Sequence, residues 1–134
     1  MIAVLDTNVV VSGMITPRGV CAEILRRVNR NVFLACVTDA ILREYEEVLT
    51  RPHLNIDLAK ARDVLAMFER LALNARPQVL GTALPDPDDK IFLAVARVVE
   101  ADYLVTGNLR HFPPQLCQGV RIISPAEFLK LLPS

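Results

Sequence analysis

Short runs of apolar residues alternate with amphipathic helical patterns along the sequence, and this alternation limits the possible folds more than any other feature. The first run, residues 2–5, is continuous and brief, as expected of a strand buried on both faces. Comparable runs predict further strands, and a shorter run predicts a weaker one. These lie at residues 32–37, 103–106, 120–123 and, for the short one, 78–80.

Between these runs the apolar residues recur at helical spacing. Helices are predicted after Arg18-Gly19, after the N-cap residues Thr38 and Ser124, and over residues 58–73 and 91–99. Strands that alternate with helices predict βαβ units. We therefore expect an α/β fold in a single domain over residues 1–134, with a central, mainly parallel sheet and helices on both faces.

Composition restricts where such a chain works and what it binds. No apolar run approaches the roughly 20 residues that a membrane helix needs, and no basic leader precedes the first apolar run, so we expect a soluble, cytoplasmic protein without membrane contact. Fifteen basic residues balance fifteen acidic ones. Nucleic acid would therefore need a local patch, a bound cation or a dimer groove rather than bulk positive charge.

Polar side chains follow two of the predicted strands. Asp6 comes directly after the first strand, and Thr106-Gly107-Asn108 follows the strand at 103–106. Because the carboxyl ends of parallel strands share one edge of a sheet, Asp6 and Asn108 are expected at the same edge. A charge there needs a partner, and Asp6 suits either a cap for the next segment or a cation ligand.

Further acids lie on two of the predicted helices. Asp86, Asp88 and Asp89 precede the helix at 91–99, where capping explains one carboxylate but three should repel one another unless a divalent cation is bound. In the helix after Thr38, periodicity leaves Glu44 and Glu46 as alternatives on either side of the apolar stripe. The sequence contains no glycine-rich phosphate loop and no serine–histidine or cysteine–histidine constellation that would compete with an acidic site.

Four segments in order resemble the PIN-domain family: residues 1–12, 41–49, 86–96 and 101–112. The likeness is strongest to small prokaryotic members grouped with the VapC-type toxins of toxin–antitoxin pairs. The family's three near-invariant acids then fall on Asp6, Glu44 and Asp89. The fourth position, commonly acidic, falls on Asn108, so this chain has one negative charge fewer than the family pattern.

The resemblance implies a divalent-metal-dependent endoribonuclease that cleaves single-stranded regions of RNA and acts as the toxin of such a pair. One or two Mg²⁺ or Mn²⁺ ions would be held by Asp6 and Asp89. Glu44 would bind a water ligand or orient the attacking water, and Asn108 would complete the surroundings. Supporting hydrogen bonds are expected from Asn8, Thr106 and Asp88.

Substrate and partners follow from the same resemblance. RNA would contact Arg110 and His111, which come just after Asn108, and Arg43; other basic candidates are Arg18, Arg51 and Lys90. A cognate antitoxin and a second copy of the chain, forming a homodimer, are the expected protein partners.

Two other functions fit parts of the pattern. A non-catalytic PIN-like module that binds RNA or protein would agree with the zero net charge and with Asn108. An acidic phosphoacceptor or phosphatase-like domain also carries Asp at a strand end. That domain, however, would be expected to have Asp-x-Asp after the first strand and Lys after a late one, and this chain has neither.

Overall fold

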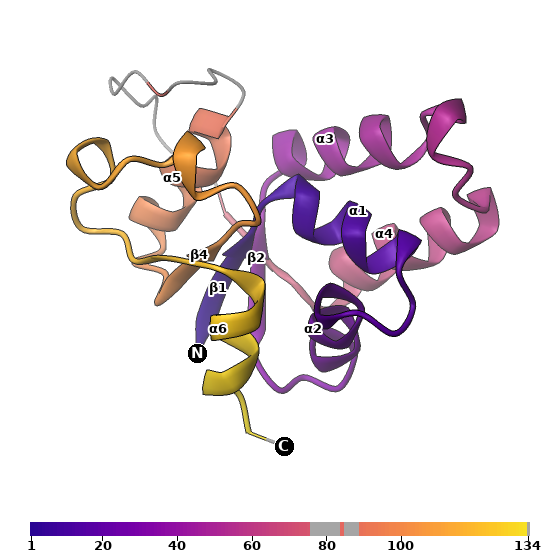
Figure 1. Cartoon of the computed structure of the whole chain (residues 1–134), viewed down its shortest axis with the longest axis horizontal. Coiled ribbons are helices and arrows are strands. Elements are labelled where there is room, and N and C mark those ends of the chain that lie inside the picture. Colours follow the sequence, from indigo (N-terminus) through magenta and orange to yellow (C-terminus); the bar gives the residue numbers. More distant parts are fainter. Residues whose placement is uncertain (76–83, 85–88, 134) are drawn as a thin grey trace.

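A computed structural model describes residues 1–75, 84 and 89–133 of the chain (Figure 1). Within these residues five strands form one sheet in the order β3-β2-β1-β4-β5, and every pairing is parallel. The strands are β1 (Ile2–Leu5), β2 (Leu34–Val37), β3 (Leu73–Asn74), β4 (Tyr103–Val105) and β5 (Ile122–Ile123). The predicted α/β fold with a parallel sheet is confirmed.

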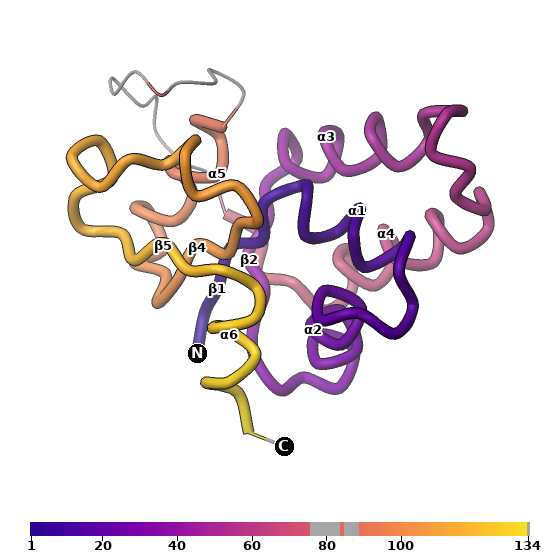
Figure 2. The backbone as a smooth tube through the Cα atoms, in the orientation of Figure 1, coloured from indigo at the N-terminus to yellow at the C-terminus, as the bar shows by residue number. Residues whose placement is uncertain are grey.

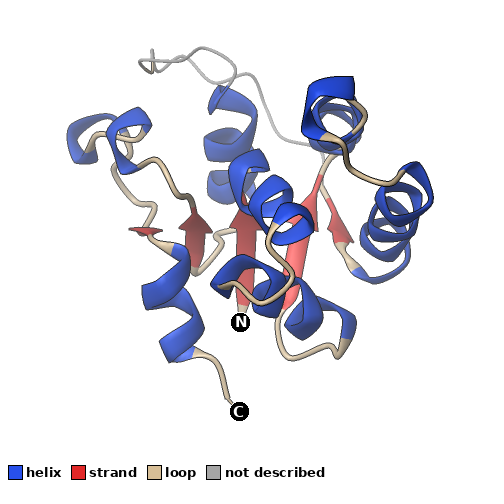
Figure 3. Cartoon of the chain, turned by 45° about the vertical axis from the view of Figure 1, so that its right-hand side comes forward, coloured by secondary structure: helices blue, strands red, loops and turns tan. Residues whose placement is uncertain are grey.

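Helices cover both faces of this sheet, as predicted. They are α1 (Thr7–Ile15), α2 (Val20–Asn29), α3 (Asp39–Leu49), α4 (Leu58–Leu71), α5 (Lys90–Val98) and α6 (Pro125–Leu131). From β1 the chain adds β2 and then β3 on one side. It then passes back across the sheet and adds β4 and β5 on the other side of β1 (Figure 2). Right-handed crossovers therefore put α5 on the face opposite α1 and α2, and Figure 3 shows α1, α2 and α6 in front of the sheet with α5 behind it. No helix in the described part of the chain is long and apolar enough to span a membrane.

Two of the predicted helix starts are confirmed by their caps. Thr38 accepts a hydrogen bond at Oγ1 from the backbone N–H of Ile41 at 3.1 Å, and Ser124 accepts one at Oγ from that of Glu127 at 3.2 Å. Each bond satisfies an N–H that the first turn of a helix leaves without a partner.

Helix α1 was not predicted, because its run Val9-Val10-Val11 is β-branched and favours a strand. It forms because Asp6 caps it and because it packs closely on α2. A Cβ added at Gly13 would lie 2.6 Å from Leu25 Cδ1 and 3.0 Å from the Cys21 carbonyl oxygen, so any other residue would force Leu25 and the α2 backbone to shift.

The prediction around residue 73 was also wrong. The helix expected over 58–73 ends at Leu71, and Leu73–Asn74 instead form β3 beside Cys36 and Val37 of β2. Backbone pairing at the sheet edge thus overrides the local apolar periodicity. The strand predicted at 78–80, Asp86 and Asp88 lie outside the described residues.

Tyr45 connects the core to the carboxyl edge of the sheet. Its ring is fully buried against Phe68, at 5.2 Å between centroids, and near Phe92, at 6.4 Å. Its hydroxyl donates to the backbone carbonyl of Leu5, the residue before Asp6. This contact fixes α3 against the end of β1, and α3 carries Glu44.

Candidate active site

Asp6 stands at the centre of the hydrogen bonds that join the ends of β1 and β4. The register pairs Leu5 with Val105, so the next residues, Asp6 and Thr106, are neighbours, and the Asp6 N–H donates to the Val105 carbonyl at 2.9 Å. Asp6 Oδ1 accepts from the Thr7 N–H at 2.8 Å, while Oδ2 accepts from Thr106 Oγ1 at 2.8 Å and Asn8 Nδ2 at 3.1 Å. Asp6 is therefore the cap of α1, and its side chain is only 4% exposed.

The turn after β4 is held by the same network. Asn8 Oδ1 accepts from the Gly107 N–H at 2.9 Å, and Thr106 Oγ1 accepts from the Asn108 N–H at 3.0 Å. Thr106 is completely buried, so its hydroxyl interacts with protein groups. These bonds bring Asn108 to the sheet edge where Asp6 lies, as the strand pattern predicted.

Glu44 joins this edge through α1. Its Oε2 accepts a hydrogen bond from Thr7 Oγ1 at 2.8 Å, although the two residues are 37 positions apart. Glu46, the alternative that periodicity left open, is exposed and lies along a different hollow between α3 and α4. The geometry therefore favours Glu44 as the acid of α3 at this edge.

Asp89 is the residue before α5 and is 7% exposed. Its Oδ2 lies 2.9 Å from His111 Nδ1, and the other ring nitrogen, Nε2, lies 3.0 Å from Asn108 Nδ2. His111 ends the short 3₁₀ turn η3 (Leu109–His111). The contact thus links the start of α5 to the turn that follows β4.

All four acid-pattern positions line one cleft of about 570 Å³, together with His111. They are Asp6, Glu44, Asp89 and Asn108. The cleft continues along α1 to η1 (Pro52–Leu54), where Arg51 and His53 complete its lining. Residues from four distant parts of the sequence therefore meet at the carboxyl edge of the sheet, where ligands bind in parallel α/β folds.

The residues predicted to contact RNA do not all line this cleft. Arg43 and Arg110, both expected near RNA, are exposed and fall outside the residues that line the cleft. Thr7 and His53 were not singled out. The position of Thr7 beside Asp6 was a usable signal, whereas His53 reaches the cleft only through the turn after α3, which no periodic pattern describes.

Burial raises the pKa of the Asp6 carboxyl above its ordinary value of 3.8, and the nearby charge of Glu44 raises it further. Hydrogen bonds from Thr106 and Thr7 act in the opposite direction, as does the positive charge that His111 carries when its ring is protonated. Burial likewise raises the pKa of the Tyr45 hydroxyl well above its usual range, and the charge of Asp6 adds to that shift. A negative charge at Asp6 is therefore costly without a cation nearby.

The donor set suits a hard cation, but it is not a closed cage. Among residues 1–75, 84 and 89–133, no group of three or more His, Cys, Asp and Glu side chains is arranged to hold an ion. Mg²⁺ keeps several water ligands and is usually bound through one or two carboxylates. The carboxylates of Asp6 and Asp89 on one cleft fit that mode, while direct ligation by all three acids does not.

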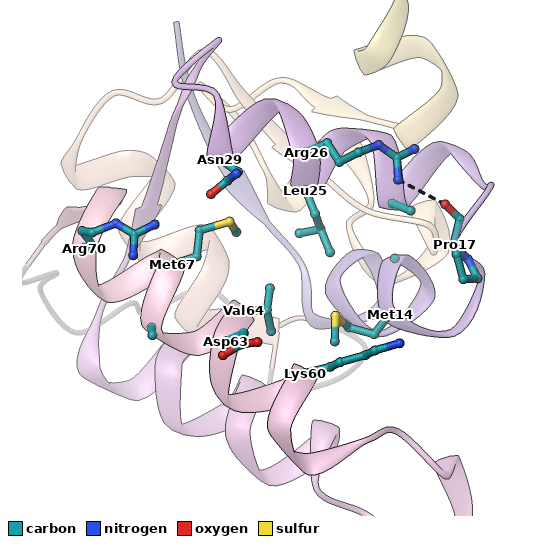
Figure 4. A pocket seen from close by; sticks show the side chains of 13 residues that line it. Met14, Pro17, Leu25, Arg26, Asn29, Lys60, Asp63, Val64, Met67 and Arg70 are labelled. Carbon is teal, nitrogen blue, oxygen red and sulfur yellow. Dashed lines mark hydrogen bonds between the residues drawn. The ribbon is translucent and has the colours of Figure 1, made fainter.

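A second cleft, of about 590 Å³, lies among α1, α2 and α4 (Figure 4). Met14, Leu25, Val64 and Met67 supply apolar side chains to it. Its charged lining is mostly basic: Arg26, Lys60 and Arg70, with Asp63 as the acid. Such a lining suits an apolar or acidic ligand rather than a metal ion.

Comparisons with known proteins agree with this fold. A family model described as "PIN domain" matches residues 3–110. No curated protein sequence matches the chain. One similar solved structure is described as "Crystal structure of VapBC2 from Rickettsia felis bound to a DNA fragment from their promoter". It is 15% identical, covers 92% of this chain and 98% of the other, and has a TM-score of 0.61. At that identity the match shows a shared fold.

Proposed function

The chain belongs to the PIN-domain family, and on that premise we propose that it is a divalent-metal-dependent endoribonuclease that cleaves single-stranded RNA. The observation that carries the proposal is that Asp6, Glu44, Asp89 and Asn108 line one cleft at the carboxyl edge of the sheet. Four independent segments would not bring acid and amide oxygens together there by capping alone.

Asp6 and Asp89 are the proposed ligands of Mg²⁺ or Mn²⁺. Asp6 is oriented by donors to both of its oxygens, from Thr7, Asn8 and Thr106, so its carboxylate keeps one direction without any reorganisation. When bound, such an ion would shield the phosphate charge and lower the pKa of the water it holds, so that this water can act as a nucleophile at neutral pH.

Glu44 is the proposed group for the attacking water. Its Oε2 accepts a hydrogen bond from the Thr7 hydroxyl at 2.8 Å, and in this proposal Oε1 accepts one from a water in the cleft. A carboxylate in that role orients the water and accepts its proton as the new phosphorus–oxygen bond forms. The phosphorus bond to the leaving sugar oxygen breaks in the same displacement, and solvent water supplies the proton that this oxygen takes up. Thr7 thereby fixes the direction in which Glu44 presents its second oxygen.

Arg51 and His53 are the proposed phosphate contacts. Both line the cleft beyond the acids, and Arg51 also pairs on the surface with Glu47 at 3.1 Å. A cleft of this size suits a few nucleotides of a single strand rather than a duplex. Basic side chains at one end and acids at the other give the strand a path across the reacting phosphate.

A toxin role with a protein antitoxin is part of the proposal. It is supported by the sequence likeness to VapC-type toxins and by the fold shared with the VapBC2 structure. The apolar cleft of Figure 4, edged by Lys60 and Arg70, offers a partner an apolar surface with basic groups at its border. A homodimer is proposed on the same resemblance.

A non-catalytic RNA-binding module is the second candidate. It is favoured by the open arrangement of the acids, since no three-ligand group is preformed in the described residues. Such a module would bind RNA equally well with Mn²⁺ or with a chelator, and it would leave the RNA intact.

The deciding experiment incubates single-stranded RNA with the wild-type chain and with Asp6→Asn, Glu44→Gln and Asp89→Asn, in Mg²⁺, Mn²⁺ or EDTA. We expect metal-dependent cleavage by the wild type and at least a hundredfold slower cleavage by each variant. Glu46→Gln, the matched change on the exposed side of α3, should cleave normally. Full activity in all three site variants would refute the assignment.

A further inference from the structure

A hydrogen bond and an ion-pair contact in series connect Asn108 to Asp89 through His111. Asn108 Nδ2 lies 3.0 Å from His111 Nε2, and His111 Nδ1 lies 2.9 Å from Asp89 Oδ2. Asn108 and His111 are three residues apart across η3, and positions i and i+3 of a 3₁₀ turn lie above one another. The turn after β4 therefore places both side chains on the side that faces Asp89.

The donors and acceptors fit one form of the imidazole ring. The Asn108 amide nitrogen can only donate, so Nε2 must offer its lone pair. In the neutral ring the proton then lies on Nδ1, the ring nitrogen that lies 2.9 Å from the Asp89 carboxylate. Asn108 thus selects the tautomer with which His111 holds Asp89.

We propose that Asn108 and His111 are positioning residues that together do the work of the missing fourth carboxylate. Asn108 fixes the ring of His111, and His111 holds the Asp89 carboxylate in the orientation in which it lines the cleft for a divalent cation. Neither residue touches the ion. This inference rests on the proposed function of the cleft, and it concerns the residues that prepare Asp89 rather than the ligands themselves.

This role differs from that of a phosphate contact, which the sequence suggested for His111. Both ring nitrogens of His111 are in contact with protein groups, Nε2 with Asn108 and Nδ1 with Asp89. The ring therefore has no N–H left for a phosphate oxygen. Groups that hydrogen-bond a metal ligand from behind set its orientation and basicity, and removing one typically weakens metal binding by about 10- to 100-fold.

The tautomer can be measured without metal. In ¹⁵N NMR of the metal-free chain with labelled histidine, His111 should show a protonated Nδ1 and an unprotonated Nε2. His53, the other histidine, identifies by contrast the signal of an exposed ring. Asn108→Leu, which keeps the size and removes the donor, should release His111 toward the Nε2–H form. A protonated Nε2 in the wild type, or an unchanged tautomer in Asn108→Leu, would overturn the relay.

Metal affinity supplies the second test, by Mn²⁺ titration with isothermal calorimetry. His111→Ala should weaken Mn²⁺ binding by about tenfold or more. His111→Asn should recover part of the loss, because its amide nitrogen can donate from near the former Nδ1 position. Arg62→Ala, at an exposed position on α4 outside the lining of this cleft, should bind Mn²⁺ like the wild type. Unchanged or tighter binding in His111→Ala would overturn this inference alone, whereas a wild type without Mn²⁺ binding would overturn the proposed function.

Discussion

Thr106 donates a hydrogen bond of 2.8 Å from Oγ1 to Asp6 Oδ2, although 100 residues separate the two in the sequence. The same hydroxyl accepts from the backbone of Asn108 at 3.0 Å and lies 3.4 Å from Asn8 Nδ2. One buried oxygen thus links the ends of β1 and β4 with the first turn of α1. The orientation of Asp6 depends on this link as much as on the sheet itself.

Replacing Thr106 with valine should loosen the site while keeping its shape. The substitution removes the hydroxyl, just after β4, that donates to the buried Asp6 carboxylate. Its loss should cost about 1–3 kcal/mol of stability. We expect this as a lower free energy of unfolding in urea, together with weaker Mn²⁺ binding. Thr106→Ser, which keeps the hydroxyl, should behave almost as the wild type. Equal loss in both variants would mean that packing of the methyl group, not the hydrogen bond, is what matters.

Neutralising Asp6 should stabilise the metal-free protein at neutral pH. Its pKa is raised in the folded chain, so folding favours the protonated form. The contribution of Asp6 to stability is therefore greatest below its unfolded pKa, near 3.8, and falls as the pH rises through the higher folded pKa. Asn caps helices about as well as Asp, and its amide nitrogen can donate to Thr106 Oγ1, which as a hydroxyl can also accept. Asp6→Asn should therefore unfold at a higher temperature in EDTA at pH 7.

The difference between Asp6→Asn and the wild type should shrink toward pH 4, as measured by thermal unfolding in EDTA across that range. Asp63→Asn, at an exposed position on α4, is the control and should show no such convergence. Added Mg²⁺ should raise the unfolding temperature of the wild type and not that of Asp6→Asn. A variant less stable than the wild type at pH 7 in EDTA would contradict the cost assigned to the buried charge.

Arg51 should affect RNA binding more than chemistry. It lines the cleft away from the acids, so Arg51→Ala should raise KM severalfold and leave kcat nearly unchanged. The dependence of KM on salt should become shallower, since one phosphate contact is lost. Arg62→Ala, an exposed position on α4, is the matched control. A fall in kcat at constant KM would instead place Arg51 in the reacting centre.

Gly13→Ala should destabilise the fold without touching the acids. The added methyl group would meet Leu25 Cδ1 at 2.6 Å and the Cys21 carbonyl at 3.0 Å. The strain, typically about 1–3 kcal/mol for an overpacked core, should exceed the gain of about 1 kcal/mol in helix propensity. Combining it with Leu25→Val should restore part of the loss in urea unfolding. Simple additivity of the two changes would argue against the contact.

The sequence predicted the parts of this molecule that depend on local pattern. The strand at residues 2–5 and that at 103–106 have continuous apolar runs, so the convergence of Asp6 and Asn108 on one edge followed from parallel topology. Glu44 was different, because a helical wheel could not separate it from Glu46. The resemblance to the family named it, and the Thr7 hydrogen bond gives the structural reason.

The contacts that were not predicted depend on how irregular segments return to the sheet. His111 reaches Asp89 only because η3 brings it back to the start of α5. No periodic pattern in residues 107–113 predicts that turn. Helix α1 was missed for a related reason, since tertiary contact with α2 and the Asp6 cap outweigh the strand preference of its valines.

The proposed reaction depends above all on the binding of a divalent cation by Asp6 and Asp89 in their shared cleft. A crystal of the wild-type chain soaked in MnCl₂ and measured for anomalous scattering tests it most directly. We predict a Mn²⁺ peak in that cleft with oxygens of Asp6 and Asp89 in its coordination shell, and its loss in Asp6→Asn. A cleft without a peak at saturating Mn²⁺, or a peak held by other residues, would contradict the claim.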